Sequence, residues 1–270
     1  MPHFICTTCG VQHAESILPP ERCAVCEDDR QYIGWGGQLW TTLPELRATH
    51  SNTFRPKGPD LIGVGTEPGF AIGQRALLVR DEAFPVLWDC ISLVDEATVA
   101  AVRAAGGVRA IAISHPHYYS AMVEWARAFD VPVYLHAADR EWVMRPDPAL
   151  TFWEGDSCRL ADDLTLIRCG GHYAGGTVLH WAAGAEGRGA LLSGDIVQVV
   201  PDVAHVGFMY SYPNLIPLPE AAVARIAAAL APYPFERIHG AWWGRLVPRD
   251  GAAVVQRSAE RYGRALRGAL

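Results

Sequence analysis

Two Cys-x-x-Cys pairs near the N-terminus constrain the fold of this chain more than any other feature. Cys6 and Cys9 form the first pair, and Cys23 and Cys26 form the second, within "CTTCGVQHAESILPPERCAVC". Each pair places two thiolates around one ion, and Gly10 allows a tight turn after the first pair. Four thiolates suit tetrahedral Zn(II) and also suit iron. The alternative is that the two cysteine pairs are unrelated, but two Cys-x-x-Cys pairs this close together rarely arise by chance.

The segment that carries these cysteines, residues 1–48, resembles a zinc ribbon or the rubredoxin-like fold. It has too few apolar residues for a core, so we expect the metal to supply much of its folding free energy. Its excess of acidic residues argues against a phosphate-binding module. Structural support or a contact in a homodimer remains as its role, and we expect Trp35 and Trp40 to dock it on the main domain.

Composition and charge restrict the class of protein. The chain has 270 residues, half of them hydrophobic, which suffices for one large domain and a small appendage. Its net charge of −6 gives no case for a nucleic-acid or anionic-membrane partner. We find no signal peptide and no apolar run of about 18–20 residues. We therefore expect a cytoplasmic protein, in which Cys90, Cys158 and Cys169 stay reduced and mostly buried.

Hydrophobic periodicity predicts strands and helices that alternate after the first fifty residues. Strands are expected in the segments RALLVR, FPVLWDC, VRAIAIS, VPVYLHA, LTLIRC, TVLHWAA, GALLSGD and FERIHG. Helices are expected after Asp95, over residues 120–129, from Pro219 and after Asp250, with both aspartates as N-caps. This order of elements predicts two sheets covered by helices.

Side chains that bind metals follow several of these strands directly. His115 and His117 follow VRAIAIS, His172 follows LTLIRC, Asp195 ends GALLSGD, and His239 follows FERI. Three neutral imidazoles and one carboxylate form a four-ligand set for a first-row divalent metal, with zinc as the default. His-x-His spacing directs both rings at one ion if the backbone bends between them.

The order of these motifs resembles the metallo-β-lactamase-fold hydrolase superfamily over roughly residues 60–245. The matching stretches are "HPHYYS" from His115, "GHYAGG" at 171–176, "LLSGD" at 191–195, and the final His239. The resemblance implies a four-layer αβ/βα sandwich over residues 49–270, behind the ribbon of residues 1–48. It also implies that His115, His117, His172 and Asp195 hold one metal ion.

The chain departs from the family pattern at two ligand positions of the second metal. Tyr119 and Ser120 stand where the family has Asp and His, so Asp195 and His239 are the ligands that remain there. We therefore expect a mononuclear site, with His239 as a supporting group or proton shuttle. Asp195 is expected to orient the zinc-bound hydroxide, and Tyr118 or Tyr119 to donate to a developing oxyanion.

The leading hypothesis is a metal-dependent hydrolase of a small-molecule ester, lactone, thioester or amide. One zinc ion in the sandwich and one in the ribbon are expected, with iron open at either. An iron-containing redox protein and a non-catalytic metal sensor are the alternatives. The aromatic segment 205–217 either lines a substrate pocket or packs over a sheet, and we expect His136 to hydrogen-bond rather than bind metal.

Each ligand also has a reading without metal. The pair His115 and His117 can cap a strand, Asp195 can accept turn amides, and His239 lacks its usual co-ligands.

Overall fold

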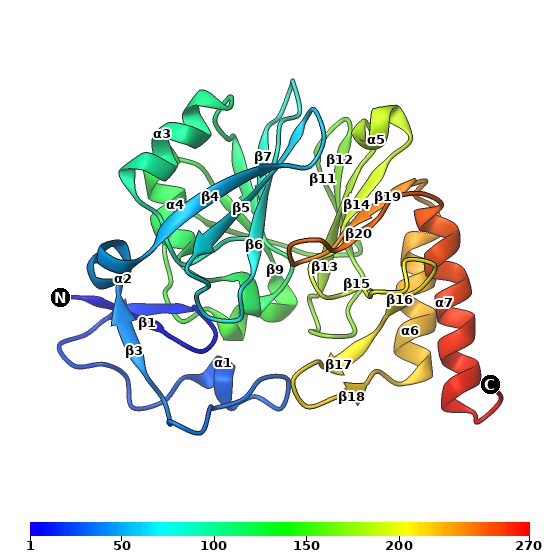
Figure 1. The fold of residues 1–270 in the computed structure, drawn as a ribbon, viewed down its shortest axis with the longest axis horizontal. Helices are drawn as coiled ribbons and strands as arrows, with labels where there is room; N and C mark the ends of the chain where they lie inside the picture. The colour runs from blue at the N-terminus through cyan, green and yellow to red at the C-terminus, as the bar shows by residue number, and fades with distance from the viewer. The chain divides into compact units, whose positions relative to one another are not determined.

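The chain, seen in a computed structural model that describes residues 1–270, divides into two compact units (Figure 1). The first unit comprises Met1–Leu135 and Asp139–Phe152. The second comprises His136–Ala138 and Trp153–Leu270. The predicted domain boundary at residue 48 lies inside the first unit and stays a prediction.

The N-terminal part of the first unit is a small ribbon. Its three-stranded sheet has the order β2-β1-β3, with β1 at His3–Cys6, β2 at Gln12–Glu15 and β3 at Trp40–Thr42. A one-turn helix, α1 (Ala24–Glu27), and a longer one, α2 (Leu43–Thr49), complete it. A capping box between Thr42 and Glu45 begins α2.

The two ribbon tryptophans differ from each other. Trp40 is partly buried and lies edge-on to the ring of His13 at 4.8 Å. Trp35 is fully exposed, so the prediction that it docks the ribbon is wrong. Trp35 belongs to the glycine-rich stretch "GWGG", in which no strand or helix fixes the backbone.

A seven-stranded sheet forms most of the first unit. In sheet order its strands are β10 (Leu150–Trp153), β9 (Val133–His136), β8 (Ala110–Ala112), β7 (Val86–Trp88), β6 (Arg75–Val79), β5 (Leu61–Glu67) and β4 (Ser51–Pro56). Strands β4 to β7 pair antiparallel, whereas β7, β8 and β9 pair parallel. The central strands are fully buried, which is typical of strands covered on both faces.

Helices α3 (Glu96–Ala104) and α4 (Met122–Phe129) connect the parallel strands. The carboxylate of Asp95 accepts the backbone N–H of Thr98 at 2.7 Å, so the predicted N-cap of α3 is confirmed. Trp125 of α4 is buried and donates its indole N–H to the carbonyl of Ile91 at 2.9 Å. Two short 3-10 helices, η1 (Pro116–Tyr118) and η2 (Ala137–Trp142), follow β8 and β9.

A six-stranded sheet organises the second unit. In sheet order its strands are β11 (Ser157–Ala161), β12 (Leu164–Arg168), β13 (Thr177–Trp181), β14 (Ala190–Leu192), β19 (Arg237–His239) and β20 (Leu246–Val247). Two small hairpins lie between β14 and β19 in the chain: β15 (Gln198–Val199) with β16 (Val206–Gly207), and β17 (Met209–Ser211) with β18 (Ile216–Pro217). A short irregular turn, α5 (Gly184–Gly187), joins β13 to β14.

The two long helices of this unit, α6 (Glu220–Leu230) and α7 (Gly251–Leu266), pack on each other and on the sheet. Val223, Ile226 and Leu230 are buried, as their helical spacing predicts. The helix after Asp250 begins where expected, but Asp250 adopts a left-handed φ of 57° and its side chain makes no cap hydrogen bond. The predicted capping role of Asp250 is therefore wrong. None of the helices combines the length and the hydropathy of a membrane-spanning segment.

Candidate metal centres

The four ribbon cysteines converge on one point. Cys6 Sγ lies 3.5 Å from Cys26 Sγ, and Cys9 Sγ lies 3.7 Å from Cys23 Sγ. All four sulfurs lie within 4.8 Å of one another, and all four residues are buried. A tetrahedral zinc with Zn–S bonds of about 2.3 Å places its sulfurs about 3.8 Å apart. The residues therefore fit one tetrahedral metal ion, as the sequence predicts.

The surroundings of the cluster also suit thiolates. The side-chain amide of Gln38 donates to Cys6 Sγ at 3.1 Å, which is the kind of contact that stabilises a metal-bound sulfur. Gly10 has a φ of +83° and donates its N–H to the carbonyl of Cys6 at 2.8 Å. This is the tight turn expected after the first cysteine pair.

The ribbon is hydrogen-bonded to the loop that carries His117 within the same unit. The side-chain amide of Gln74 donates to the carbonyl of Cys9 at 3.2 Å and to that of His117 at 3.3 Å. The N–H of Gln12 donates to the carbonyl of Ser120 at 3.0 Å. Gln74 was not predictable from the sequence, because a glutamine that donates to backbone carbonyls belongs to no recognisable motif.

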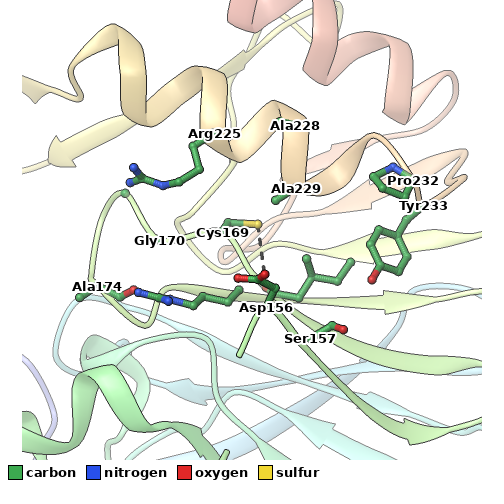
Figure 2. A pocket seen from close by; sticks show the side chains of 13 residues that line it. Asp156, Ser157, Cys169, Gly170, Ala174, Arg225, Ala228, Ala229, Pro232 and Tyr233 are labelled. Atoms are coloured by element: carbon green, nitrogen blue, oxygen red, sulfur yellow. Dashed lines mark hydrogen bonds between the residues drawn. The ribbon is translucent and has the colours of Figure 1, made fainter. Parts of the chain in front are cut away.

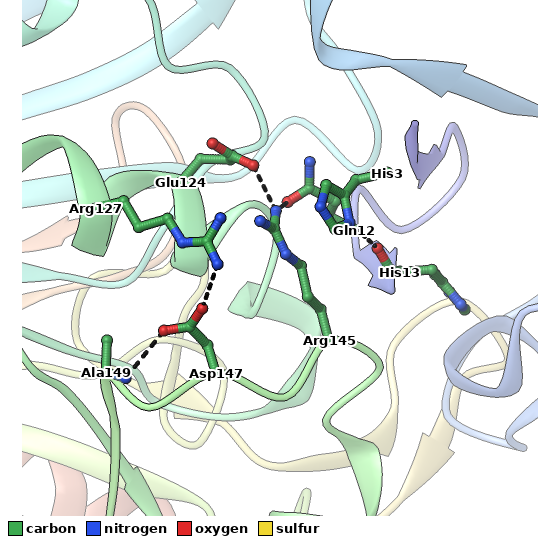
Figure 3. Close-up of polar contacts among 8 residues, drawn as sticks. All are labelled: His3, Gln12, His13, Glu124, Arg127, Arg145, Asp147 and Ala149. Carbon is green, nitrogen blue, oxygen red and sulfur yellow. Dashed lines mark hydrogen bonds and ion pairs between the residues drawn. The ribbon is translucent and has the colours of Figure 1, made fainter. Parts of the chain in front are cut away.

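An arginine adds a second connection from the ribbon to the sheet domain of the first unit. The guanidinium of Arg145 donates to the side chain of Gln12 in β2 and pairs with Glu124 in α4 (Figure 3). Arg145 is buried, so these contacts are poorly screened by solvent. The ribbon therefore braces the segment between His115 and α4.

His115 and His117 lie next to each other after β8. The 3-10 helix η1 bends the backbone between them, and their ring centroids are 5.0 Å apart. Both are buried, with ligand nitrogens within 4.8 Å of each other. Asp89 supports the loop by accepting the N–H of Ser114 at 2.8 Å. The bend that two rings need to reach one ion is therefore present.

Burial keeps the His115 ring neutral, which is the form that binds metals. Burial, with a smaller effect from Arg30, lowers the pKa of His115 to about 3. The hydroxyl of Ser114 lies 2.9 Å from Nδ1 of His115 and so orients the ring.

The second unit presents a matching pair, His172 and Asp195. Nδ1 of His172 lies 3.2 Å from the carbonyl of Met209, so Nδ1 carries the proton and Nε2 carries the lone pair. A ring nitrogen of His172 and a carboxylate oxygen of Asp195 lie within 4.8 Å of each other. Burial raises the pKa of Asp195 to about 7, although His172 acts in the opposite direction.

Local backbone structure fixes Asp195 directly after β14. The Ser193 N–H donates to the carbonyl of His239 at 3.0 Å, and its hydroxyl donates to that of Val197 at 2.6 Å. Gly194 adopts a φ of +52°, which turns the chain sharply. His239 ends β19, the parallel neighbour of β14, and is buried. Its role stays a prediction.

The aromatic segment 205–217 has two functions in the structure of the second unit. Phe208 is fully buried in the core formed with α6 and α7. Tyr212 instead lies beside His172, with 5.7 Å between ring centroids, and donates its hydroxyl to the carbonyl of Asp195 at 2.8 Å. Tyr212 thus holds the Asp195 turn, a role that the sequence did not assign to an individual residue.

The remaining candidates have protein partners. The hydroxyl of Tyr119 donates to the carbonyl of Asp139 at 3.3 Å, and that of Ser120 to the carbonyl of Cys90 at 3.3 Å. His136 accepts the N–H of Ala138 on Nδ1 at 3.1 Å, so its Nε2–H donates to the carbonyl of Gly155 at 3.1 Å. Both His136 nitrogens are therefore used in hydrogen bonds, as expected.

Comparison with solved structures identifies the fold. The match to the DIM-1 metallo-β-lactamase spans 78% of this chain and 98% of that protein, at a TM-score of 0.58 and 16% identity. The match to the mono-zinc form of the metallo-β-lactamase FIM-1 from Pseudomonas aeruginosa spans 78% of this chain and 96% of that protein, at a TM-score of 0.55 and 16% identity. The match to TTHA1623 in a di-iron-bound form spans 76% of this chain and 98% of that protein, at a TM-score of 0.50 and 23% identity. The chain has the metallo-β-lactamase fold, as the motifs predict, with a four-cysteine ribbon before it.

A sequence relative completes the comparison. No family model matches the chain. The protein described as "Uncharacterized protein YmaE", from Bacillus subtilis strain 168, is 49% identical over 272 residues, which span 100% of this chain and 99% of the relative. At this identity over both full lengths, the chain belongs to the same protein family as YmaE.

Proposed function

We propose that the chain is a metal-dependent hydrolase that cleaves a small-molecule ester, lactone, thioester or amide. The observation that carries the proposal is the pairing of donors on a fold shared with metallo-β-lactamases. One unit holds two buried imidazoles after β8, and the other holds an imidazole and a buried carboxylate at the ends of its strands. In this proposal the two pairs bind the same ion.

The four donors suit one first-row divalent metal, and zinc is the proposed ion. His115, His117 and His172 supply neutral nitrogens, and Asp195 supplies an oxygen. A zinc ion held there would supply Lewis-acid chemistry, which activates water for attack and polarises a carbonyl oxygen. The mono-zinc form described for FIM-1 supports a site with one ion in this fold.

Asp195 is proposed to orient the attacking water and to accept its proton. Tyr212 holds the backbone of the Asp195 turn, because its hydroxyl donates to the Asp195 carbonyl. His239, at the end of the neighbouring strand, is proposed to move the proton onward. Tyr119 is left out of the mechanism, because an oxyanion would have to displace its bond to Asp139.

The absence of aspartate and histidine at positions 119 and 120 favours one ion over two. Tyr119 and Ser120 both donate to backbone carbonyls, and neither side chain is a good zinc ligand.

The four cysteines of the ribbon are proposed to hold a separate, structural zinc. Because all seven cysteines are unbonded, a reducing compartment such as the cytoplasm is proposed for the protein.

The test is turnover by the zinc-loaded protein on a panel of esters, lactones, thioesters and amides. We expect hydrolysis of at least one class, reduced by a factor of about 10² or more in Asp195→Ala. His205→Ala is the control, because His205 pairs with Asp202 on the surface. If the protein binds zinc at the proposed site but hydrolyses no class of substrate, the proposal is contradicted and the non-catalytic sensor is favoured.

An iron-containing redox protein is the second candidate. A similar structure is described as di-iron-bound, and four thiolates hold iron as well as zinc. Iron in the purified protein, with visible Fe–thiolate absorption, would favour this candidate over the hydrolase.

A further inference from the structure

The second unit contains a groove that the metal centres do not use. It lies between α6 and the strands β11 and β12, and its volume is about 800 Å³ (Figure 2). A cavity of this size accommodates a small organic molecule. Its lining combines two arginines, one carboxylate and an apolar floor.

One end of the groove is cationic. Arg225, on α6, reaches the loop after β12, where its Nη2 lies 3.5 Å from the position that a Cβ of Gly170 would take. Arg168 reaches the same loop and donates through Nε to the carbonyl of Ala174 at 3.0 Å. Neither guanidinium forms an ion pair with a carboxylate of the chain. Two cations therefore flank one loop with donors left for an anion.

The other end is apolar. Pro232 and Tyr233, which follow α6, stand at the opposite end of the groove from Arg225 (Figure 2). Ala229 and Cys169 lie between the two ends, and burial raises the pKa of Cys169 to about 12, so this thiol is neutral. The groove therefore offers an apolar surface next to its cationic end.

Asp156 sets the charge of the ligand. It lines the middle of the groove, so the three ionised side chains there sum to one positive charge. A second negative charge along the body of a ligand would face this carboxylate. A monoanion with an uncharged body is the matching charge pattern.

We propose that this groove binds an organic monocarboxylate, with its carboxylate at Arg168 and Arg225 and its apolar body against Ala229 and Tyr233. One wall of the groove is the loop from Gly170 to Ala174, which also carries His172. An occupant therefore contacts the loop that carries His172. This inference does not depend on the proposed hydrolase activity.

The test is calorimetric titration of the full chain with octanoate, together with amide NMR shifts. We expect a Kd of about 1 mM or tighter, with shifts at Gly170 and Ala229. The neutral analogue 1-octanol and inorganic phosphate are expected to bind at least about tenfold more weakly, because each lacks one half of the match. Equal binding of 1-octanol or phosphate, or no octanoate binding at 10-fold higher concentrations, would overturn the proposal.

Variants separate the groove from nonspecific binding. Arg225→Gln removes one cation, and Ala228→Trp fills the groove from an exposed position of α6. Both are expected to weaken octanoate binding at least about tenfold. Arg159→Gln is the matched control, because Arg159 lies on β11 outside the groove and pairs with Asp162. Unchanged affinity in Arg225→Gln and Ala228→Trp would place the ligand elsewhere and refute the assignment.

Discussion

The side-chain amide of Gln74 donates to the carbonyl of His117 at 3.3 Å, and the same nitrogen donates to the carbonyl of Cys9. One buried glutamine thus connects the cysteine cluster to the loop of a candidate metal ligand. The ribbon of the first unit is a brace for the His115–His117 segment as well as a metal site of its own. This relationship leads to the first prediction.

Replacing Gln74 by Met is expected to lower the free energy of unfolding and to reduce metal retention at the ribbon and at the His115–His117 loop. The change keeps the volume but leaves two buried carbonyls without their donor, at a cost of about 1–3 kcal/mol. Urea unfolding measures the stability, and metal release to a chelator measures retention at each centre. Gln256→Met is the control, because Gln256 donates to the carbonyl of Ala227 on α6. Equal effects in the two variants would contradict the bracing role.

Gly10→Ala is expected to destabilise the ribbon through both strain and a clash. Gly10 has a φ of +83°, and an added Cβ would lie 2.5 Å from the hydroxyl oxygen of Ser92. Gly37 has a φ of +76° with open space around it, so Gly37→Ala isolates the backbone strain. We expect Gly10→Ala to cost about 1–3 kcal/mol more than Gly37→Ala and to release ribbon metal faster. Matching results for the two variants would show that this close approach is unimportant.

Acid is expected to destabilise the second unit partly through His180. Burial lowers the pKa of His180, and the opposing bond to the carbonyl of Pro234 is the smaller effect. Because the folded-state pKa lies below the unfolded value, the unfolded chain binds the proton first as pH falls below about 6.5. Stability is therefore lost on the acid side. His180→Gln should lose less free energy of unfolding than wild type between pH 7.5 and 5.5, and equal losses would exclude a contribution from His180.

Most strands of the two sheets were predictable from the sequence, and so was the position of the candidate ligands directly after three of them. VRAIAIS, LTLIRC and GALLSGD contain strands, and each ends before a candidate ligand. The apolar runs in these segments are short, which favours a buried strand over a helix. The cysteine cluster was equally predictable, since its spacing is fixed by tetrahedral geometry.

Features that depend on tertiary contacts were not predictable. Asp250 directly precedes a helix, as an N-cap residue does, but its backbone is left-handed and its side chain makes no capping hydrogen bond. The two-residue strands β15 and β16 are too short to carry a period of hydrophobicity. Gln74 and Tyr212 act through bonds to backbone carbonyls distant in sequence, which leave no local pattern.

Metal content per chain, measured by elemental analysis, tests the central claim most directly. The proposal predicts about two zinc ions in wild type, falling to one in His115→Ala/His117→Ala and to one in Cys23→Ser/Cys26→Ser, because each change removes half of one ligand set. One ion in wild type that the histidine changes leave in place would contradict the hydrolase mechanism. About three ions would contradict the single-ion site instead.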